Sequence, residues 1–181
     1  MTALTEFAHA GYAGTSLQRI AELAGLSKSS VLYHFASKEA LLEAVIAPAI
    51  DRMERIVESI EGSAFTRDSR DRFVVQFADF LLAHRLEVHM FINQGSSLED
   101  VPVVERANVM VVRLATYFST ATSTTEDSMR FAIALGGAAY TLATQDSIAP
   151  ANRAPVDEIR AALITIVTEL LAPVPVRSTT P

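Results

Sequence analysis

Cysteine is absent from this chain of 181 residues. A chain without cysteine forms no disulfides and offers no thiolate metal ligands, so we expect a cytoplasmic protein. The first twelve residues also lack the charged start and apolar stretch of a secretory signal. The longest uncharged apolar run covers about 131–145. It is shorter than the roughly 20 residues that cross a bilayer, so it predicts a buried helix and no membrane contact.

Basic residues are also scarce. The net charge is −6, from 15 Lys and Arg against 21 Asp and Glu. Even the first 48 residues contain three basic residues against four acidic ones. Because nucleic-acid-binding proteins usually present a basic patch, the overall charge argues against that class of partner.

Glycine and proline number only seven each, and most of them lie between stretches of helical periodicity. No alternating strand runs with hairpin signals occur, so the sequence predicts an all-α fold. Pro48 lies inside the fourth helix and should kink or split it. The expected helices are 2–10, 16–24, 28–35, 38–60, 69–84, 86–93, 103–119, 126–146 and 156–171.

Hydroxyl residues precede three of the first helices. Thr15, with Gln18 three positions later, predicts a capping box for the second helix. Ser27 and Ser37 are predicted to cap the third and fourth helices. Gly25 should end the second helix, because glycine tolerates the left-handed conformation of a tight turn. Two short helices joined in this way predict a helix-turn-helix.

The third helix is predicted to have one buried and one polar face. At about 100° per residue, Val31 and Phe35 point to the same side. The opposite side then carries four donors: Ser29, Ser30, Tyr33 and His34. Such groups can bond phosphates and base edges in a major groove, although an ordinary solvated surface is the alternative. Helix N-termini near Lys28 and Lys38 could hold phosphates without a basic domain.

The stretch 4–45 resembles the N-terminal domain of tetracycline-repressor (TetR) type transcriptional regulators. The motif elements are Gly11-Tyr12, Thr15-Ser16, Ile20-Ala21, Gly25, Ser27, His34-Phe35 and Ser37-Lys38-Glu39. The resemblance implies that the third helix is the recognition helix. It also implies that Ser27, Lys28, Ser29, Tyr33 and His34 contact DNA, and we add Ser30 because it lies on the same polar face. The contacts that it implies with phosphates come from Thr15, Ser16 and Lys38.

The sequence departs from that family at two positions of the third helix. The family often has glycine where Ser29 stands and tyrosine where Leu32 stands, whereas the tyrosine here is Tyr33. No operator sequence is therefore carried over. Family members usually have a longer, often basic segment before the equivalent of Leu4. Either the start of this sequence is truncated or the protein lacks that arm; in the second case we expect a phosphate contact to be missing.

Three regions are expected: a DNA-binding domain (1–47), an effector-binding and dimerisation domain (48–172) and a disordered tail (173–181). Since one recognition helix reads few bases, a double-stranded operator calls for a homodimer. The last two helices suit that role, because 131–143 is apolar nearly all round with Gly136 and Gly137, and 156–171 carries two apolar stripes. The alternative is that both helices form only the monomer core.

The middle helices contain many aromatic residues and methionines, which form either a core or a ligand pocket. Because the resemblance implies effectors bound between the fifth and eighth helices, we expect a small, mostly hydrophobic effector. The candidate ligand-binding residues are Phe77, Phe80, His84, Met90, Asn93, Met110, Tyr117 and Tyr140.

Enzymatic chemistry is not predicted. The chain contains no G-x-S-x-G, phosphate-binding glycine loop or H-E-x-x-H pattern. His84 and His89 are five positions apart, which does not place them on one helical face as metal ligands. We therefore predict no cofactor, no metal and no catalytic residue. The sequence favours a repressor released from DNA by an effector; the alternative is an all-helical ligand-binding or interaction protein whose helix-turn-helix no longer binds DNA specifically.

Overall fold

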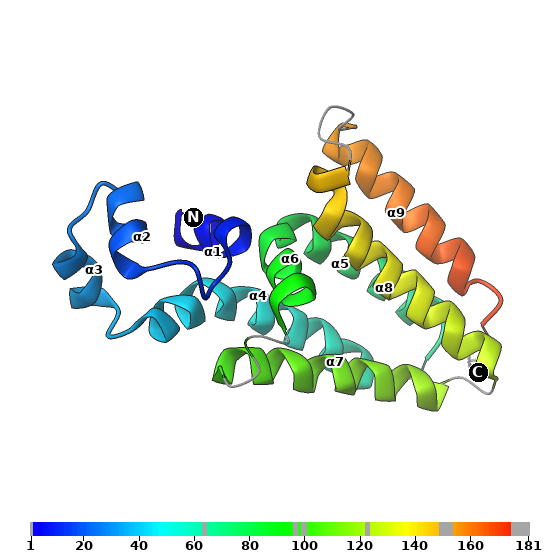
Figure 1. Cartoon of the computed structure of the whole chain (residues 1–181). Helices are drawn as coiled ribbons and strands as arrows, with labels where there is room; N and C mark the ends of the chain where they lie inside the picture. The colour runs from blue at the N-terminus through cyan, green and yellow to red at the C-terminus, as the bar shows by residue number, and fades with distance from the viewer. Residues whose placement is uncertain are drawn as a thin grey trace.

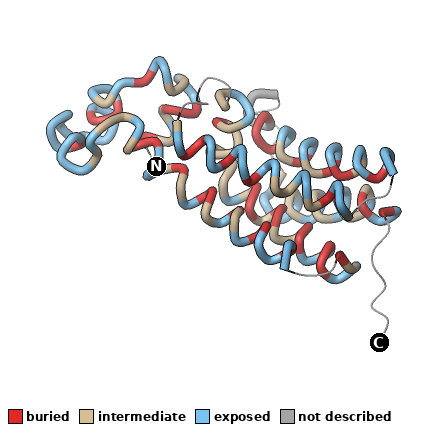
Figure 2. Tube along the Cα trace, turned by 90° about the horizontal axis from the view of Figure 1, so that it is seen from below, coloured by how far each residue is buried: buried red, intermediate tan, exposed pale blue. Residues whose placement is uncertain are grey.

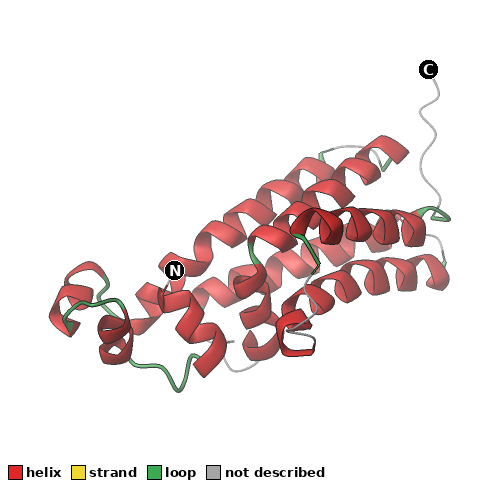
Figure 3. Cartoon of the chain, turned by 90° about the horizontal axis from the view of Figure 1, so that it is seen from above, coloured by secondary structure: helices red, strands yellow, loops and turns green. Residues whose placement is uncertain are grey.

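A computed structural model describes residues 2–62, 65–95, 98, 101–121, 124–148 and 154–174, excluding the side chains of 121 and 145–148. Within these ranges the chain forms helices and no strand (Figure 3), which confirms the all-α prediction. The helices are α1 (Thr2–Ala10), α2 (Leu17–Leu23), α3 (Lys28–His34), α4 (Lys38–Glu61), α5 (Arg67–Ala83), α6 (Arg85–Gln94), α7 (Pro102–Ala121), α8 (Thr125–Ile148) and α9 (Val156–Leu171).

The helices form a small head and a larger body (Figure 1). Helices α1 to α3 make the head, and α4 runs from the head into the body, where it lies along α7. Helix α9 packs against α5 and α8, and α6 packs against both α8 and α1. Helix α6 is therefore in contact with the head as well as with the body.

The predicted caps are confirmed for α3 and α4. The Ser27 hydroxyl accepts the Ser30 N–H at 3.1 Å, and the Ser37 hydroxyl accepts the Ala40 N–H at 3.1 Å. Each cap satisfies one of the free N–H groups of a helix N-terminus.

The predicted capping box of α2 is wrong. The cap is Ser16, whose hydroxyl accepts the Arg19 N–H at 3.1 Å. Thr15 is buried instead, and its hydroxyl donates to the Gly11 carbonyl at 2.7 Å. Gln18 bonds Glu22 one helical turn further on. The inward orientation of Thr15 moves the cap by one residue.

The turn between α2 and α3 has the predicted geometry. Gly25 adopts φ of +69°, in the left-handed region. The Leu26 N–H donates to the Ala21 carbonyl at 2.8 Å, and the Gly25 N–H donates to the Glu22 carbonyl at 3.1 Å. These two bonds form a Schellman motif, which stops α2 and redirects the chain into α3.

Helix α4 continues through Pro48, so the predicted split does not occur. A proline removes one hydrogen bond from a helix. Packing holds α4 on both sides of that position, because Ile46 and Ile50 are buried. Further along, Arg106 of α7 bonds Asp51 and Glu54 of α4 at 2.8 and 2.9 Å. The two long helices are therefore joined by both apolar and ionic contacts.

Buried residues recur along the helices of the head and the body (Figure 2). They form two clusters. One lies in the body, between α4, α5, α7, α8 and α9. The other joins the head to α4, α6 and α7, so the core crosses the predicted boundary between residues 47 and 48. Of the predicted tail, 175–181 lies outside the described residues, and Val174 is buried in the body. None of the described helices has the length and apolar character of a membrane span.

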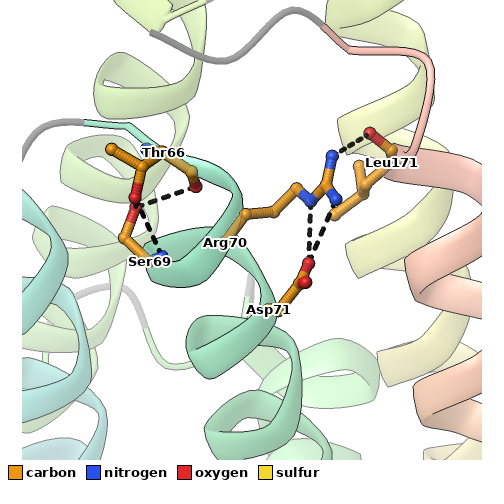
Figure 4. A network of polar contacts seen from close by, with 5 residues as sticks. All are labelled: Thr66, Ser69, Arg70, Asp71 and Leu171. Atoms are coloured by element: carbon orange, nitrogen blue, oxygen red, sulfur yellow. Dashed lines mark hydrogen bonds and ion pairs between the residues drawn. The ribbon is translucent and has the colours of Figure 1, made fainter. Parts of the chain in front are cut away.

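A buried arginine connects the start of α5 to the end of α9 (Figure 4). Thr66 and Ser69 form a capping box at the N-terminus of α5, and Arg70 follows directly. The Arg70 side chain is only 4% exposed; its Nη1 donates to the Leu171 carbonyl at 3.1 Å and its Nη2 lies 3.1 Å from Asp71. Leu171 is the last residue of α9, so the guanidinium satisfies a carbonyl that the helix leaves free.

Replacing this arginine should destabilise the body. We expect Arg70→Met to lower the free energy of unfolding by about 1.5–3 kcal/mol, because a buried carbonyl loses a charged donor while the aliphatic packing is kept. Urea unfolding measures the change. The control is the exposed neighbour, Arg72→Met, which should shift stability by no more than about 0.5 kcal/mol. Equal shifts in the two variants would contradict the role of the Leu171 bond.

Candidate nucleic-acid interface and apolar cavity

Helix α3 lies at the tip of the head (Figure 1), and its polar residues are exposed. Val31 is buried at 6% exposure, which anchors one side of the helix as predicted. Tyr33 on the opposite side is 85% exposed, and Lys28, Ser29, Ser30 and His34 are exposed as well. Side chains of this kind, on a helix that projects from a small domain, can reach the floor of a major groove.

The serines at the start of α3 form a hydrogen-bonded group. The Ser27 hydroxyl lies 2.8 Å from both the Ser29 and Ser30 hydroxyls and also accepts the Ser30 N–H. All three are exposed at the positive end of the helix dipole. Hydroxyls that exchange partners within such a group can turn toward a phosphate without leaving a buried group unsatisfied.

Aromatic contacts restrain the end of α3. The Tyr33 and His34 rings meet edge to face, with centroids 5.2 Å apart and planes at 85°. The His34 ring also lies 6.5 Å from that of Phe35, which is partly buried in the head. The exposed phenol is thereby presented in a limited range of directions, which suits direct contact with a base edge.

Lys38 organises the interior of the head. Its ammonium donates to the Tyr12 and Thr15 carbonyls at 2.9 and 3.0 Å, and it lies 4.2 Å from the centroid of the Tyr12 ring. Two of its three N–H bonds are used in this way. Together with the burial of Thr15, these contacts show that both residues hold the turn between α1 and α2. Their predicted contacts with phosphate remain predictions.

Tyr12 and Glu39 add a second polar contact beside that lysine. The Tyr12 phenol donates to the Glu39 carboxylate at 3.0 Å. Burial, followed by this bond, raises the pKa of Tyr12 to about 12. Backbone N–H bonding at the start of α4, then the Ser37 hydroxyl and the phenol, lower the pKa of Glu39. The phenol therefore stays a donor and the carboxylate an acceptor across the neutral pH range.

The body contains an apolar cavity of about 440 Å³. Helices α4 to α8 line it, and its polar lining is almost nil. Five of the eight candidate ligand-binding residues lie on its wall: Phe77, Phe80, Met90, Met110 and Tyr140. A space of this size and character suits a small hydrophobic molecule.

The other three candidates lie elsewhere. His84 is at the junction of α5 and α6, where its ring faces Phe80 and its Nδ1 lies 3.1 Å from Glu87. Asn93 is exposed, and its amide donates to the carbonyl one turn back on α6. Tyr117 packs against Phe65 in a separate aromatic group of the body. None of the three lines the cavity.

Helix α4 supplies wall residues that the list of candidates missed. Ile46, Ala49, Ile50 and Met53 all line the cavity. Their spacing of three, four and seven positions is the signal of an apolar helical stripe. That spacing was available in the sequence, but it does not distinguish a cavity wall from an ordinary core.

An apolar strip of α8 is exposed on the body. Met129, Ile133 and Tyr140 are 54%, 56% and 55% exposed, and Gly136 and Gly137 lie between them. On the neighbouring α9, Ile166 is 54% exposed, while Val167 and Leu171 are buried. Residues of both predicted α9 stripes pack against the body. Ile166 and the α8 strip leave large apolar side chains in solvent, as an interaction surface would.

Metal chemistry has no obvious location in the described part of the chain. No group of three or more His, Cys, Asp or Glu residues there could hold an ion.

The head matches a known family of regulators. The family described as bacterial regulatory proteins, tetR family, matches residues 2–45. The transcriptional regulator RutR of Escherichia coli K12 is 53% identical over 49 residues, 27% of this chain and 23% of RutR. The head of the chain is therefore similar in sequence to the tetR family. The matched residues include α1 to α3 and the start of α4, so the structure places the shared sequence in the head.

A second relative is similar over a stretch longer than the head. IcaR of Staphylococcus aureus Newman, a negative transcriptional regulator of the biofilm operon icaADBC, is 32% identical over 99 residues, 54% of this chain and 52% of IcaR. The matched part of the chain thus spans about a quarter of the length of RutR and about half of the length of IcaR.

Solved structures match nearly the whole chain. The ketosteroid regulator KstR2 of Mycobacterium tuberculosis aligns with a TM-score of 0.66 and 15% identity over 98% of this chain and 92% of KstR2. A tetR-family regulator of Bordetella parapertussis aligns with a TM-score of 0.66 and 19% identity over 92% and 90%. At these identities the likeness concerns the fold.

Filling the cavity should block the binding of an apolar probe. We expect Ala139→Phe, at the wall of α8, to weaken binding of the uncharged dye Nile red by about tenfold, or 1.4 kcal/mol, since the added ring occupies the space. Dye fluorescence measures the affinity. Ala115→Phe, at an exposed position of α7, is the matched control and should leave it unchanged. Equal binding by both variants would show that the dye enters elsewhere.

Proposed function

We propose that this protein is a DNA-binding transcriptional regulator, a repressor that a small hydrophobic effector releases from its operator. The observation that carries the proposal is the exposed donor face of α3, on a head whose residues 2–45 match the tetR family. The chain also shares sequence with the transcriptional regulators RutR and IcaR. The proposal places the protein in the cytoplasm and assigns it no catalytic role.

In this proposal α3 lies in the major groove of double-stranded DNA. Ser29, Ser30, Tyr33 and His34 would face base edges, while Ser16, Ser27 and Lys28 would contact phosphates. The caps Ser16, Ser27 and Ser37 mark three helix N-termini in the head, and their dipoles favour anions. Such contacts allow an acidic protein to bind DNA with a moderate dependence on salt.

Specific recognition of an operator would require two protomers, each of which supplies one α3 helix. The exposed face of α8 and α9 supplies apolar side chains with glycines between them, which let a second pair of helices approach closely. We therefore propose a homodimer through α8 and α9, in which the two α3 helices bind successive half-sites.

The effector would occupy the apolar cavity. The lining from α4 supports this step, because α4 also begins in the head and could transmit a displacement to α3. KstR2, which shares the fold, is described as a ketosteroid regulator, and a Clostridium perfringens neighbour as a putative fatty acid metabolism regulator. The effector must bind the DNA-free state more tightly, since equal affinity shifts no equilibrium.

The alternative is an all-helical ligand-binding or interaction protein that no longer binds DNA specifically. The net charge of −6 favours it. Selection of sites from a random duplex library separates the two.

Variants of the head should affect DNA binding in different ways. We expect Tyr33→Ala to weaken binding to the selected site by about 1–3 kcal/mol, because it removes a base contact. Lys28→Ala should reduce the slope of log affinity against log salt by about 0.9, the contribution of one phosphate. Fluorescence anisotropy measures both effects. The control, Arg67→Ala at the exposed start of α5, should leave both unchanged. Failure of the wild type to select any site would overturn the proposal.

A charge on the exposed face of α8 should separate the dimer. We expect Ile133→Asp to yield monomers, because dimerisation would then bury an unpaired carboxylate. Sedimentation velocity measures the mass. The control, Val112→Asp, introduces the same charge at a 63% exposed position of α7 and should remain dimeric. A monomeric wild type, or a dimeric Ile133→Asp, would contradict the proposed interface.

A further inference from the structure

One side chain from the body completes the end of α1 in the head. Gln94 is the last residue of α6. Its Oε1 accepts the Tyr12 N–H at 2.8 Å, and its Nε2 donates to the Phe7 carbonyl at 2.9 Å. Phe7 and Tyr12 lie on either side of the end of α1, where a helix leaves carbonyls without partners. The amide of Gln94 therefore serves as a helix cap supplied from more than 80 residues away.

The geometry requires both halves of an amide. Gln94 must accept at one atom and donate at the other, and only one orientation of its side chain satisfies Tyr12 and Phe7 together. The backbone between them turns at Gly11, where φ is +81°. A Cβ at Gly11 would lie 3.9 Å from the Gln94 Oε1, so the amide fits closely over the turn.

Tyr12, which bonds Gln94, also bonds residues that hold α4 and the start of α2. Its carbonyl accepts the Lys38 ammonium, which also bonds the Thr15 carbonyl just before the α2 cap. The Tyr12 phenol bonds Glu39 in the first turn of α4. Its ring also lies 5.3 Å from that of Phe7. A movement of Gln94 would thus reach both helices that position α3.

Other residues of the same helix, and Gly95 directly after it, line the apolar cavity. Met90, Phe91 and Gly95 belong to its wall, and Met90 is 1% exposed. Met90 is also part of the buried cluster that contains Phe7. One helix of ten residues therefore contacts the cavity along its length and holds the head at its end.

We propose that Gln94 is the positioning residue that connects the occupancy of the cavity to the placement of the head. An occupant that displaces the end of α6 would break or weaken the bonds of the Gln94 amide to Tyr12 and Phe7, releasing the end of α1 and the Tyr12 turn. This inference rests on the proposed function for its biological meaning. It adds a route through α6 and α1 to the route through α4, whose residues also line the cavity.

The test follows the Tyr12 amide by NMR hydrogen exchange in the full-length protein, with and without Nile red. We expect the dye to change the exchange rate of this amide by fivefold or more in the wild type. In Gln94→Met, which keeps the side-chain length but cannot form either bond, the dye should change that rate by less than twofold. The Leu26 amide, bonded within the head, should not respond in any variant.

The matched control is Asn93→Leu, which removes an amide from the adjacent, exposed position of α6. It should retain the full response of the wild type to the dye. Gln94→Glu is a second variant in case Gln94→Met unfolds. It keeps an acceptor for Tyr12 but loses the donor to Phe7, so its response should be reduced. The inference would be overturned if the dye left the exchange rate of the Tyr12 amide unchanged in the wild type. It would also be overturned if the dye changed that rate as much in both Gln94 variants as in the wild type.

This experiment is independent of DNA. If the wild type fails to select a DNA site but the dye response depends on Gln94, the proposed function fails and the inference stands. If DNA is selected but the dye response survives both Gln94 substitutions, the inference fails and the proposed function stands.

Discussion

The ammonium of Lys38, at the first position of α4, holds the head together. It donates to the Tyr12 and Thr15 carbonyls and covers the Tyr12 ring, so one charge satisfies the turn between α1 and α2. A lysine can bond two carbonyls at once and still pack its stem on an aromatic face. Because α3 is joined to α4 by only three residues, its direction depends on this contact.

An acidic protein can still present a surface suited to phosphate. The head has few cations, but three serines cap three helix N-termini, and the exposed α3 face carries hydrogen-bond donors with Lys28 as its only Lys or Arg. Hydroxyls and backbone N–H groups hold anions through hydrogen bonds and helix dipoles, whereas a net positive charge acts mainly at long range. The overall charge is therefore a poor guide to a surface of this kind.

The cavity and the head share one buried cluster. Apolar residues of α4, α6 and α7 line the cavity, and their neighbours belong to the cluster that also contains Phe7 and Ile20 of the head. Closely packed interiors transmit small displacements, because side chains have few alternative arrangements. This continuous packing connects the wall of the cavity to the head through side-chain contacts alone.

The sequence alone determined the features that depend on neighbouring residues. The caps Ser27 and Ser37, the Gly25 turn, the burial of Val31 and the bounds of α9 all follow from rules that act within one or two helical turns. Only the tertiary structure decided which apolar residues line a cavity and which polar ones turn inward. Thr15 does not cap α2, because its hydroxyl bonds the Gly11 carbonyl instead. Pro48 does not split α4, and the Gln94 side chain bonds Tyr12, which is 82 positions away in the sequence. Periodicity shows that a side chain faces other helices, but the packing of those helices decides what it meets.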